Sequence, residues 1–512
     1  MGGKAVTDAD GPESEALDGE DRGGPHRSPH PRWPRRTSLG PLRGRWAVIL
    51  PVVVVLVGGA VVDGLFPVSS AAPVPATGDG VLVAPPDARS ASAFCAAGTG
   101  TAANTTIYLT NSTSRSVSGA MTSVGLATSS GTVPTVRRSV VAPPLGTMAV
   151  NPASGLPPGS SSSSFTFTSG GVTVRQVVGG PNGWSTAPCA TQPSSRWAFA
   201  GGSTMPGYAL TLSLFNPAAS DAAVNISFFT SSGLITPQAY QGLTVSAGQM
   251  VAENVGDFVQ NSSDIATLVT AQSGTVVSTE FQQLSSGSSG GLSLRLGAPA
   301  LSTVWRFAQT TNTSGSTVTF YLANPTSAPV AATIAFGLSS GSVEPRHLVV
   351  GPLSESAFVA SGTTGVPQQV PYSVTVTASA PIVAGRSVQA ASTASQPVFG
   401  SSSGTVTAAD RWLVPGPGVP AAPGTTGATV ESLAVANPGP SVAMVTVAVL
   451  GGAHPVSMFA VAPGGVAVLG PKQVGGLPVL TVSSSQPVNV EEDSGPTGAP
   501  GVVSSTGFPF VG

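Results

Sequence analysis

The sequence is organised around a short strand pattern that ends in Asn-Pro and recurs along the chain. Full copies end at Asn216-Pro217, Asn324-Pro325 and Asn437-Pro438, and an earlier copy ends at Asn111-Ser112. In each copy the residues two and four positions before Asn are apolar, which is the period-two pattern of a half-buried strand. Proline lacks a backbone N–H, and Asn readily bonds its own backbone in a turn. The pattern therefore predicts a strand that ends in a fixed turn, repeated along the chain.

The spacing of these copies indicates the size of the repeated unit. The Asn residues are 105, 108 and 113 positions apart, which is too long for solenoid repeats and fits a β-sandwich of about 100 residues. A second strand follows each Asn-Pro in constant register, and a hairpin, turning at Ser379-Ala380-Pro381 in one copy, is expected to close each unit. We therefore expect an all-β chain of four tandem immunoglobulin-like β-sandwiches in a fairly stiff array, at 91–192, 193–300, 301–407 and 408–512.

Composition supports an all-β interpretation and excludes some functions. Charged residues make up 8% of the chain, against about 25% in ordinary globular domains. The 64 glycines and 47 prolines favour many turns. The net charge is −2, and no basic face interleaved with aromatic residues follows the N-terminal region, so we expect no nucleic-acid partner.

The N-terminal region predicts export. Residues 1–45 are expected to form a disordered cytoplasmic tail, 46–66 a transmembrane helix acting as a signal anchor, and 67–90 a Pro/Ala-rich spacer. Five arginines closely precede the apolar run, so the positive-inside rule places the N-terminus in the cytoplasm and the bulk of this single-pass protein outside the cell membrane. The alternative is a signal peptide cleaved near Ser69-Ser70-Ala71-Ala72, which would secrete the rest.

The two cysteines fit an exported region. Cys95 and Cys189 both fall in the first predicted sandwich, and export favours a disulfide between them over two buried thiols. A bridge closing so long a loop would tie the two ends of this unit together.

No catalytic constellation stands out. Serines are so frequent that no single one can be identified as a nucleophile. Phosphate-binding and dinucleotide-binding motifs lie between a strand and a helix, and the sequence has none in that setting. The acidic run Glu491-Glu492-Asp493 has two interpretations, a calcium site and a solvated turn. The turn is favoured because the spacing of the acids matches no calcium-binding loop. We expect no enzyme activity, no cofactor and no metal.

Three tryptophans recur at equivalent places, each beside an arginine: Trp197, Trp305 and Trp412. Exposed aromatic residues would form ligand-facing sites, because arginine stacks on tryptophan and sugars bind aromatic rings. Repetition at equal positions is more simply explained by a core residue in each unit, so both interpretations are carried forward.

The arginine run ending at Arg45, the apolar run 46–62 and the Asn-Pro motifs at 216, 324 and 437 together resemble an uncharacterised family of actinobacterial membrane-anchored extracytoplasmic proteins. The first unit departs from that pattern, with Ser112 in place of proline. This family of unknown function carries no activity that the resemblance could transfer.

The sequence thus favours a non-enzymatic, membrane-tethered protein of the bacterial cell envelope, acting as a structural, adhesion or scaffold module. Its expected partners are the membrane, through the single span, and cell-wall polysaccharide or an envelope protein. An accessory subunit of an envelope glycan-assembly or secretion enzyme is the alternative, and a cell-wall hydrolase is the third. The oligomeric state is left open.

Overall fold

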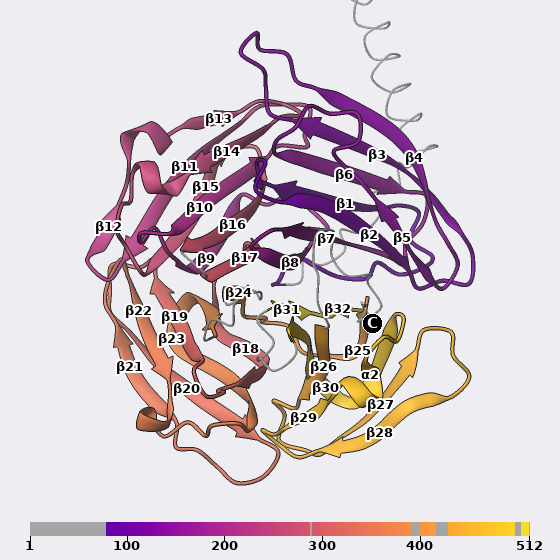
Figure 1. The fold of residues 1–512 in the computed structure, drawn as a ribbon, viewed down its shortest axis with the longest axis vertical. Helices are drawn as coiled ribbons and strands as arrows, with labels where there is room; N and C mark the ends of the chain where they lie inside the picture. Colours follow the sequence, from indigo (N-terminus) through magenta and orange to yellow (C-terminus); the bar gives the residue numbers. More distant parts are fainter. Residues whose placement is uncertain (1–77, 287–288, 391–398, 416–428, 497–502, 511–512) are drawn as a thin grey trace, which may run out of the picture. The chain divides into compact units, whose positions relative to one another are not determined.

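The computed structural model describes residues 78–286, 289–390, 399–415, 429–496 and 503–510 (Figure 1). The chain divides into two compact units, 1–70 and 71–512, and every described residue lies in the second. The described residues are nearly all β, with several sheets. No helix among them has the length and hydrophobicity needed to cross a bilayer. The predicted cytoplasmic tail and the predicted span 46–66 lie outside the described residues.

The first segment with the Asn pattern contains two antiparallel four-stranded sheets. One sheet has the order β1-β6-β3-β4, formed by β1 (Ala91–Ala97), β6 (Ser161–Phe167), β3 (Val117–Gly125) and β4 (Thr135–Ala142). The other has the order β5-β2-β7-β8, formed by β5 (Gly146–Val150), β2 (Asn104–Asn111), β7 (Val172–Gly180) and β8 (Gly183–Pro188). Apolar residues from both sheets, such as Leu109 and Phe165, form one core cluster.

The second segment repeats this division. One sheet holds β12 (Gly233–Ile235), β11 (Ala222–Thr230), β13 (Leu243–Val245), β15 (Ile265–Ser273) and β9 (Arg196–Gly202). Opposite it, the order β14-β10-β16-β17 joins β14 (Met250–Asn254), β10 (Tyr208–Phe215), β16 (Val277–Ser286) and β17 (Ser289–Leu296). Short 3₁₀ turns η1 (Gln238–Tyr240) and η2 (Val255–Asp257) lie in its loops.

In the third segment a single long strand belongs to both sheets. β23 (Pro371–Gln389) pairs with β18 (Ser302–Thr311) and β20 (Val330–Leu338) along its first half, and β20 also pairs with β21 (Arg346–Val350). Its second half pairs with β19 (Thr317–Asn324), which carries β22 (Ser354–Ala360), and with β24 (Phe399–Ser403). The 3₁₀ turn η3 (Gly362–Thr364) precedes β23.

The fourth segment is built in the same way around β30 (Leu480–Pro496). This strand pairs first with β25 (Ala409–Val414) and β27 (Ala443–Val449), and then with β26 (Thr429–Ala436) and β31 (Val503–Thr506). The remaining elements are β28 (Pro455–Val461), β29 (Val466–Leu469), β32 (Phe508–Pro509) and the one-turn helix α2 (Pro471–Val474).

The predicted closing hairpins are wrong. At Ser379-Ala380-Pro381 the chain does not fold back on its own sheet; β23 runs on and passes from one sheet to the other. In the first segment the corresponding strands β6 and β7 likewise lie in different sheets. Strands that switch sheets form the corners of packed two-sheet structures, so the turn-like residues mark a crossing between sheets.

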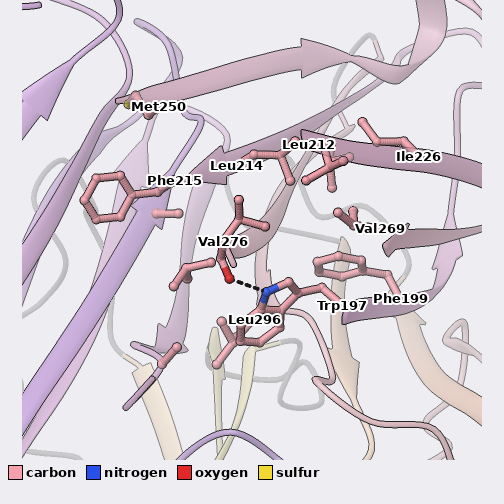
Figure 2. Close-up of a cluster of buried hydrophobic side chains, with 14 of the residues drawn as sticks. Trp197, Phe199, Leu212, Leu214, Phe215, Ile226, Met250, Val269, Val276 and Leu296 are labelled. Carbon is pink, nitrogen blue, oxygen red and sulfur yellow. Dashed lines mark hydrogen bonds between the residues drawn. The ribbon is translucent and has the colours of Figure 1, made fainter. Parts of the chain in front are cut away.

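The alternating apolar residues do face the core as the pattern predicts. Leu212, Leu214 and Ile226 are fully buried, and Figure 2 shows them in the same cluster as the Trp197 ring. Burying each such side chain contributes about 1.5–3 kcal/mol. Local period-two patterning therefore selects the inward face of these strands.

The predicted spacer 67–90 needs correction where it is described. Val81 and Val83 are buried in the core cluster of the second segment. Val83 forms a parallel bridge with Phe510, and its N–H donates to the Pro509 carbonyl at 2.8 Å. These valines are packed because they fill a gap between the first and last described parts of the chain, which a flexible spacer would not do.

Candidate functional site

The motif asparagine makes the same contacts in all four segments. Asn216, for example, is fully buried; its Nδ2 donates to the carbonyls of Ser220 and Val245, both at 2.8 Å, and its Oδ1 accepts the Ala218 N–H at 3.0 Å. The equivalent bonds occur at Asn111, Asn324 and Asn437. Each side chain joins its own turn to the end of a strand in the opposite sheet. The motif therefore has a structural role, and Asn111 keeps it without a following proline.

The three repeated tryptophans are buried, with 0% of each side chain exposed. Their indole N–H groups donate to the carbonyls of Val276, Ile382 and Val488 at 2.7, 3.0 and 3.0 Å, where the chain crosses between sheets. A ligand cannot reach rings in this position, so the ligand-facing expectation for Trp197, Trp305 and Trp412 does not hold. A buried indole whose N–H finds a partner is the ordinary arrangement for a core tryptophan.

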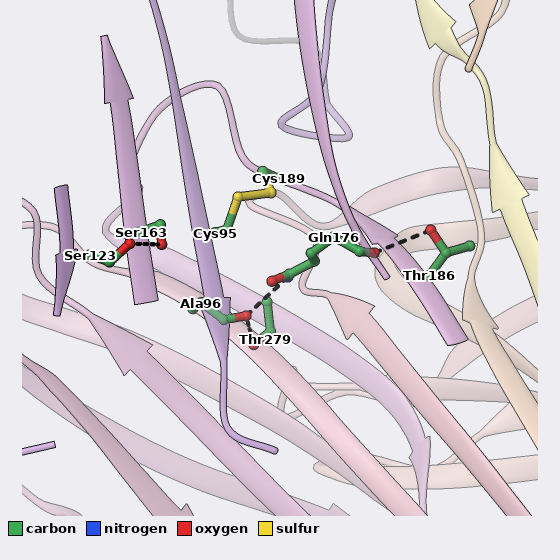
Figure 3. Close-up of a disulfide and its surroundings, with 8 residues drawn as sticks. All are labelled: Cys95, Ala96, Ser123, Ser163, Gln176, Thr186, Cys189 and Thr279. Carbon is green, nitrogen blue, oxygen red and sulfur yellow. Dashed lines mark hydrogen bonds between the residues drawn. A yellow bond between two sulfur atoms is a disulfide. The ribbon is translucent and has the colours of Figure 1, made fainter. Parts of the chain in front are cut away.

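The predicted disulfide is confirmed. Cys95 and Cys189 are bonded and buried (Figure 3). Phe94 pairs with Ala190 in the same way that Ala198 pairs with Ala298, so Ala93 occupies the place of Trp197. The first segment thus has a small residue where the others have tryptophan, and its disulfide fastens that end.

The four segments meet at their last strands. β8 contacts β17, β17 contacts β24, β24 contacts β31, and β31 contacts β8. β17 and β24 also pair, through Gly291 and Phe399, which joins the inner sheets of the second and third segments. The sequence left open whether the segments form a straight rod or fold on each other, and this closed set of contacts brings the first and fourth segments together.

A cavity of about 80 Å³ lies among these inner strands. Thr186, Arg295, Ser402 and Ser504 line it, one from each of β8, β17, β24 and β31, together with Asp79. Its size suits a few water molecules, given roughly 30 Å³ for each in the liquid. A space of this volume is too small for a sugar ring.

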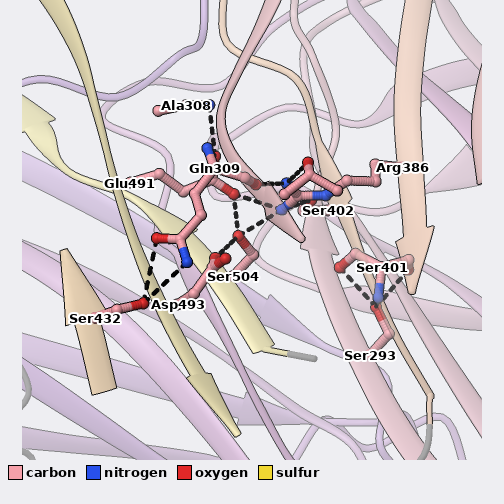
Figure 4. Close-up of polar contacts among 11 residues, drawn as sticks. Ser293, Ala308, Gln309, Arg386, Ser401, Ser402, Ser432, Glu491, Asp493 and Ser504 are labelled. Carbon is pink, nitrogen blue, oxygen red and sulfur yellow. Dashed lines mark hydrogen bonds and ion pairs between the residues drawn. The ribbon is translucent and has the colours of Figure 1, made fainter. Parts of the chain in front are cut away.

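The largest polar network joins the third and fourth segments. Arg386 Nη2 lies 2.5 Å from Glu491 Oε1, and Glu491 Oε2 accepts the N–H groups of Ala308 and Gln309 at 2.7 and 3.1 Å. Ser504 donates to Glu491 and to Asp493 (Figure 4). Almost every acceptor of the Glu491 carboxylate is used, which is what a charge buried this deeply requires.

Burial and charge shift the pKa values within this network in opposing ways. Burial alone would lower the pKa of the Arg386 guanidinium, but the carboxylates of Glu491 and Asp493 outweigh it, and the pKa lies above its usual value. Burial, reinforced by the neighbouring Glu491 charge, raises the pKa of Asp493 well above its usual range. Asp493 therefore holds a proton more tightly than a carboxyl group in water does.

Two further charged contacts link segments that are far apart in sequence. Arg175 Nη1 lies 3.4 Å from Glu492 Oε2, which connects the first and fourth segments. Glu355 Oε1 accepts the Gly201 N–H at 2.8 Å, which connects the third and second. Burial raises the pKa of Glu355 well above its usual value. Gly201 adopts φ +81°, and a Cβ there would lie 2.3 Å from the Tyr321 ring, so this contact requires glycine.

The second segment carries its own buried pair beside this contact. Arg295 Nη2 lies 2.5 Å from Glu280 Oε2, and Thr267 donates to the other Glu280 oxygen at 2.6 Å. Burial raises the pKa of Glu280 above its usual value, although Arg295 opposes that shift. Arg295 also donates to the Ala200 carbonyl, so the pair holds β17 against β9.

The solvated turn predicted for the acidic run of the fourth segment is wrong. Glu491, Glu492 and Asp493 lie within β30 and are 5, 8 and 4% exposed. No group of three His, Cys, Asp or Glu side chains in the described ranges is arranged to hold a metal ion. These carboxyl groups bind arginine side chains, serine hydroxyls and backbone N–H groups, and they join the segments through buried ion pairs.

Comparison of equivalent positions in the four segments would have predicted these buried charges. The strand that pairs with each motif strand carries a polar residue opposite the position four before Asn: Gln176, Glu280, Arg386 and Glu492. A polar residue recurring at one place in otherwise apolar strands indicates a shared polar interior. Each of these residues taken alone resembles a surface polar residue, and only the comparison across copies reveals the pattern.

Comparisons with known proteins give a family match for part of the chain. Residues 159–303 match a family of unknown function (DUF5719). No curated protein matches the sequence.

Similar solved structures include Thermotoga maritima 1070, at 16% identity and a TM-score of 0.19, which covers 20% of this chain and 92% of that one. Another is the tetra-tandem repeat in the extending region of a large adhesion protein, at 13% identity and a TM-score of 0.11. That likeness covers 78% of this chain and 93% of the other. Neither likeness is strong enough to carry an argument about function.

Proposed function

We propose that this chain is a non-enzymatic protein of the bacterial cell envelope whose four segments are immunoglobulin-like sandwiches acting as one structural, adhesion or scaffold module. The segment 46–66 would tether it to the cytoplasmic membrane with the β-rich region outside. The observation that carries this proposal is that the buried ionisable groups are engaged in joining the segments. Arg386 with Glu491 and Arg175 with Glu492 are examples.

The disulfide supports the extracytoplasmic location. Cys95 and Cys189 are bonded and buried, and such bonds persist in oxidising compartments. Buried salt bridges favour one arrangement of segments, because removing either partner leaves an uncompensated charge. A module locked in this way would present fixed outer sheets and loops to a polymer or a protein partner.

The proposal is tested by pull-down from envelope extract with the purified full chain as bait, analysing polysaccharide and protein separately. The matched control is the Asn324→Ala variant, which has the same surface charge and a weakened fold. Retention of a wall glycan or an envelope protein by the wild type, and not by the control, is expected. Turnover of a wall glycan or peptide by the purified chain would overturn the non-enzymatic assignment, and selective retention of a glycan-assembly enzyme would favour an accessory role.

A further inference from the structure

A second cavity lies at the junction of the third and fourth segments. It has a volume of about 250 Å³, and its lining includes Arg306, Phe336, Gly337, Ser373, Thr375 and Asn489. It shares no lining residue with the inner cavity. We refer to it as the junction cleft.

The junction cleft occurs where the repeated construction changes. The residue thirteen positions after the motif Asn is Val124, Phe229 and Leu450 in the first, second and fourth segments, and each packs against a core cluster that extends into another segment. In the third segment this residue is Gly337. A Cβ there would lie 2.0 Å from the Gly464 carbonyl oxygen and 2.5 Å from Ser373 Oγ, so glycine lets the fourth segment approach and no side chain fills the space.

Arg306 brings a positive charge to this cleft. It is half-buried, its Nη1 donates to the Val406 carbonyl at 2.8 Å, and its Nε has no partner in the described part of the chain. Burial lowers the pKa of this guanidinium, with partial opposition from Asp79. The Asp79 carboxylate already accepts bonds from Thr405 Oγ1 at 2.6 Å and from the Val406 and Thr407 N–H groups at 2.7 and 3.1 Å.

Comparison with other arginines shows that this environment is specific. Arg175, Arg295 and Arg386 are buried, and each forms an ion pair with a glutamate. Among the described residues no carboxylate forms an ion pair with Arg306. Arg196 and Arg411 directly precede the repeated tryptophans and are exposed, whereas Arg306 follows Trp305 and takes the place that Ala198 has in the second segment. A partly buried guanidinium whose nearest carboxylate, Asp79, is bonded to other groups is incompletely compensated, and an anion in the cleft would relieve this.

Asn489 supplies a second polar group at the cleft. Its side chain is 1% exposed, its Nδ2 donates to the Thr407 carbonyl, and its Oδ1 has no partner within the described ranges. Buried polar atoms normally find partners, so an unpaired one beside a cavity points to a group that completes it. Ser373 and Thr375 add hydroxyl groups, and Phe336 adds an apolar wall. Several polar groups that converge beside an apolar wall are typical of small-molecule sites.

We propose that the junction cleft binds a small carboxylate-bearing ligand, with Arg306 as its cationic partner. A carboxylate matches the planar fork of a guanidinium and carries the one negative charge that one arginine balances. This site does not depend on the proposed scaffold role, since a module of another function would keep the same cleft.

The test is titration of the purified full chain with sodium glucuronate, followed by calorimetry and thermal unfolding, with glucose and glucose 6-phosphate at matched ionic strength. Glucuronate is expected to bind and raise Tm, and Arg306→Gln is expected to weaken binding at least tenfold. The control Arg196→Gln removes an exposed arginine beside the tryptophan of another segment, and this variant is expected to bind as the wild type does. Equal binding of glucose, tighter binding of glucose 6-phosphate, or an unaffected Arg306→Gln variant would each overturn the proposal.

Hydrogen exchange on the wild-type chain provides a test that needs no variant. Glucuronate should slow exchange at residues 335–337 and 373–375, which line the cleft. No change there at a concentration that raises Tm would place the ligand elsewhere and overturn the proposal. Pull-down of envelope partners would be unaffected by either result, so failure of this inference is distinguishable from failure of the scaffold role.

Discussion

Replacing Asn324 by alanine should strongly destabilise the protein. Its side chain donates to the carbonyls of Ala328, Gly351 and Val350 at 2.7, 2.9 and 3.3 Å, and accepts from the N–H and hydroxyl of Thr326 at 2.9 and 2.7 Å. Asn324 and Val350 are fully buried, so water cannot replace the bond between them. Leaving a buried acceptor unpaired costs about 1–3 kcal/mol, and the other four bonds contribute roughly 0.5–1 kcal/mol each, which predicts a loss of about 3–7 kcal/mol.

The assay is urea unfolding followed by tryptophan fluorescence, since Trp305 is buried in the same segment. Asn151→Ala is the matched control, because Asn151 is exposed and its side chain makes the same turn bond to Ala153 N–H at 2.9 Å. That control should change the free energy of unfolding by about 0.5 kcal/mol or less. Asn324→Asp should be as damaging as alanine, because a carboxylate would face three carbonyl oxygens. A loss below about 1 kcal/mol for Asn324→Ala, or one equal to the control, would refute the structural role of the motif.

Three further predictions concern the buried bonds and charges. Converting Cys95 and Cys189 to serine should lower the free energy of unfolding by about 4–5 kcal/mol on the loop-entropy model, and reduction of the wild type should match the variant in a denaturant titration. Arg386→Met should cost about 3–5 kcal/mol by leaving Glu491 uncompensated, and adding Glu491→Leu should restore part of that; a double mutant no more stable than Arg386→Met would contradict a buried ion pair. The folded state holds the Glu355 proton more tightly than the unfolded state, so the free energy of unfolding should fall as pH rises above about 4.5. The Glu355→Gln variant lacks this proton and should show a smaller fall between pH 5 and pH 8. An unchanged pH dependence in the variant would contradict a raised pKa for Glu355.

The strands and turns built on local pattern were predictable from the sequence. The alternation at Leu212 and Leu214 identifies the buried face, because it depends on neighbours two residues apart. The pairing of Cys95 with Cys189 was predictable because the region is expected to be exported and contains two cysteines. The turn-like residues at Ser379-Ala380-Pro381 predicted a hairpin, but the strand crosses between sheets there. The two structures use similar residues and differ only in which distant strands pair with the chain on either side.

The meeting of the four segments could not be derived from local pattern. Arg175 and Glu492 are 317 positions apart, and their contact depends on how whole segments pack. For the same reason the run Glu491-Glu492-Asp493 resembled a surface turn, because nothing in its immediate sequence reveals that arginines from other segments neutralise it. The junction cleft depends on a single glycine, Gly337, whose significance appears only when the four segments are superimposed on the motif Asn.

Small-angle scattering of residues 71–512 tests the central claim, that the four segments close on one another through their inner strands, most directly. A compact unit of this length is expected to have a radius of gyration of about 22 Å. Four segments in line, each with a radius of gyration of about 13 Å, would give about 40 Å. The contacts among β8, β17, β24 and β31 predict the lower value. A value near the higher one would show that the segments do not close, and the buried ion pairs between them would have to be abandoned as the basis of the fold.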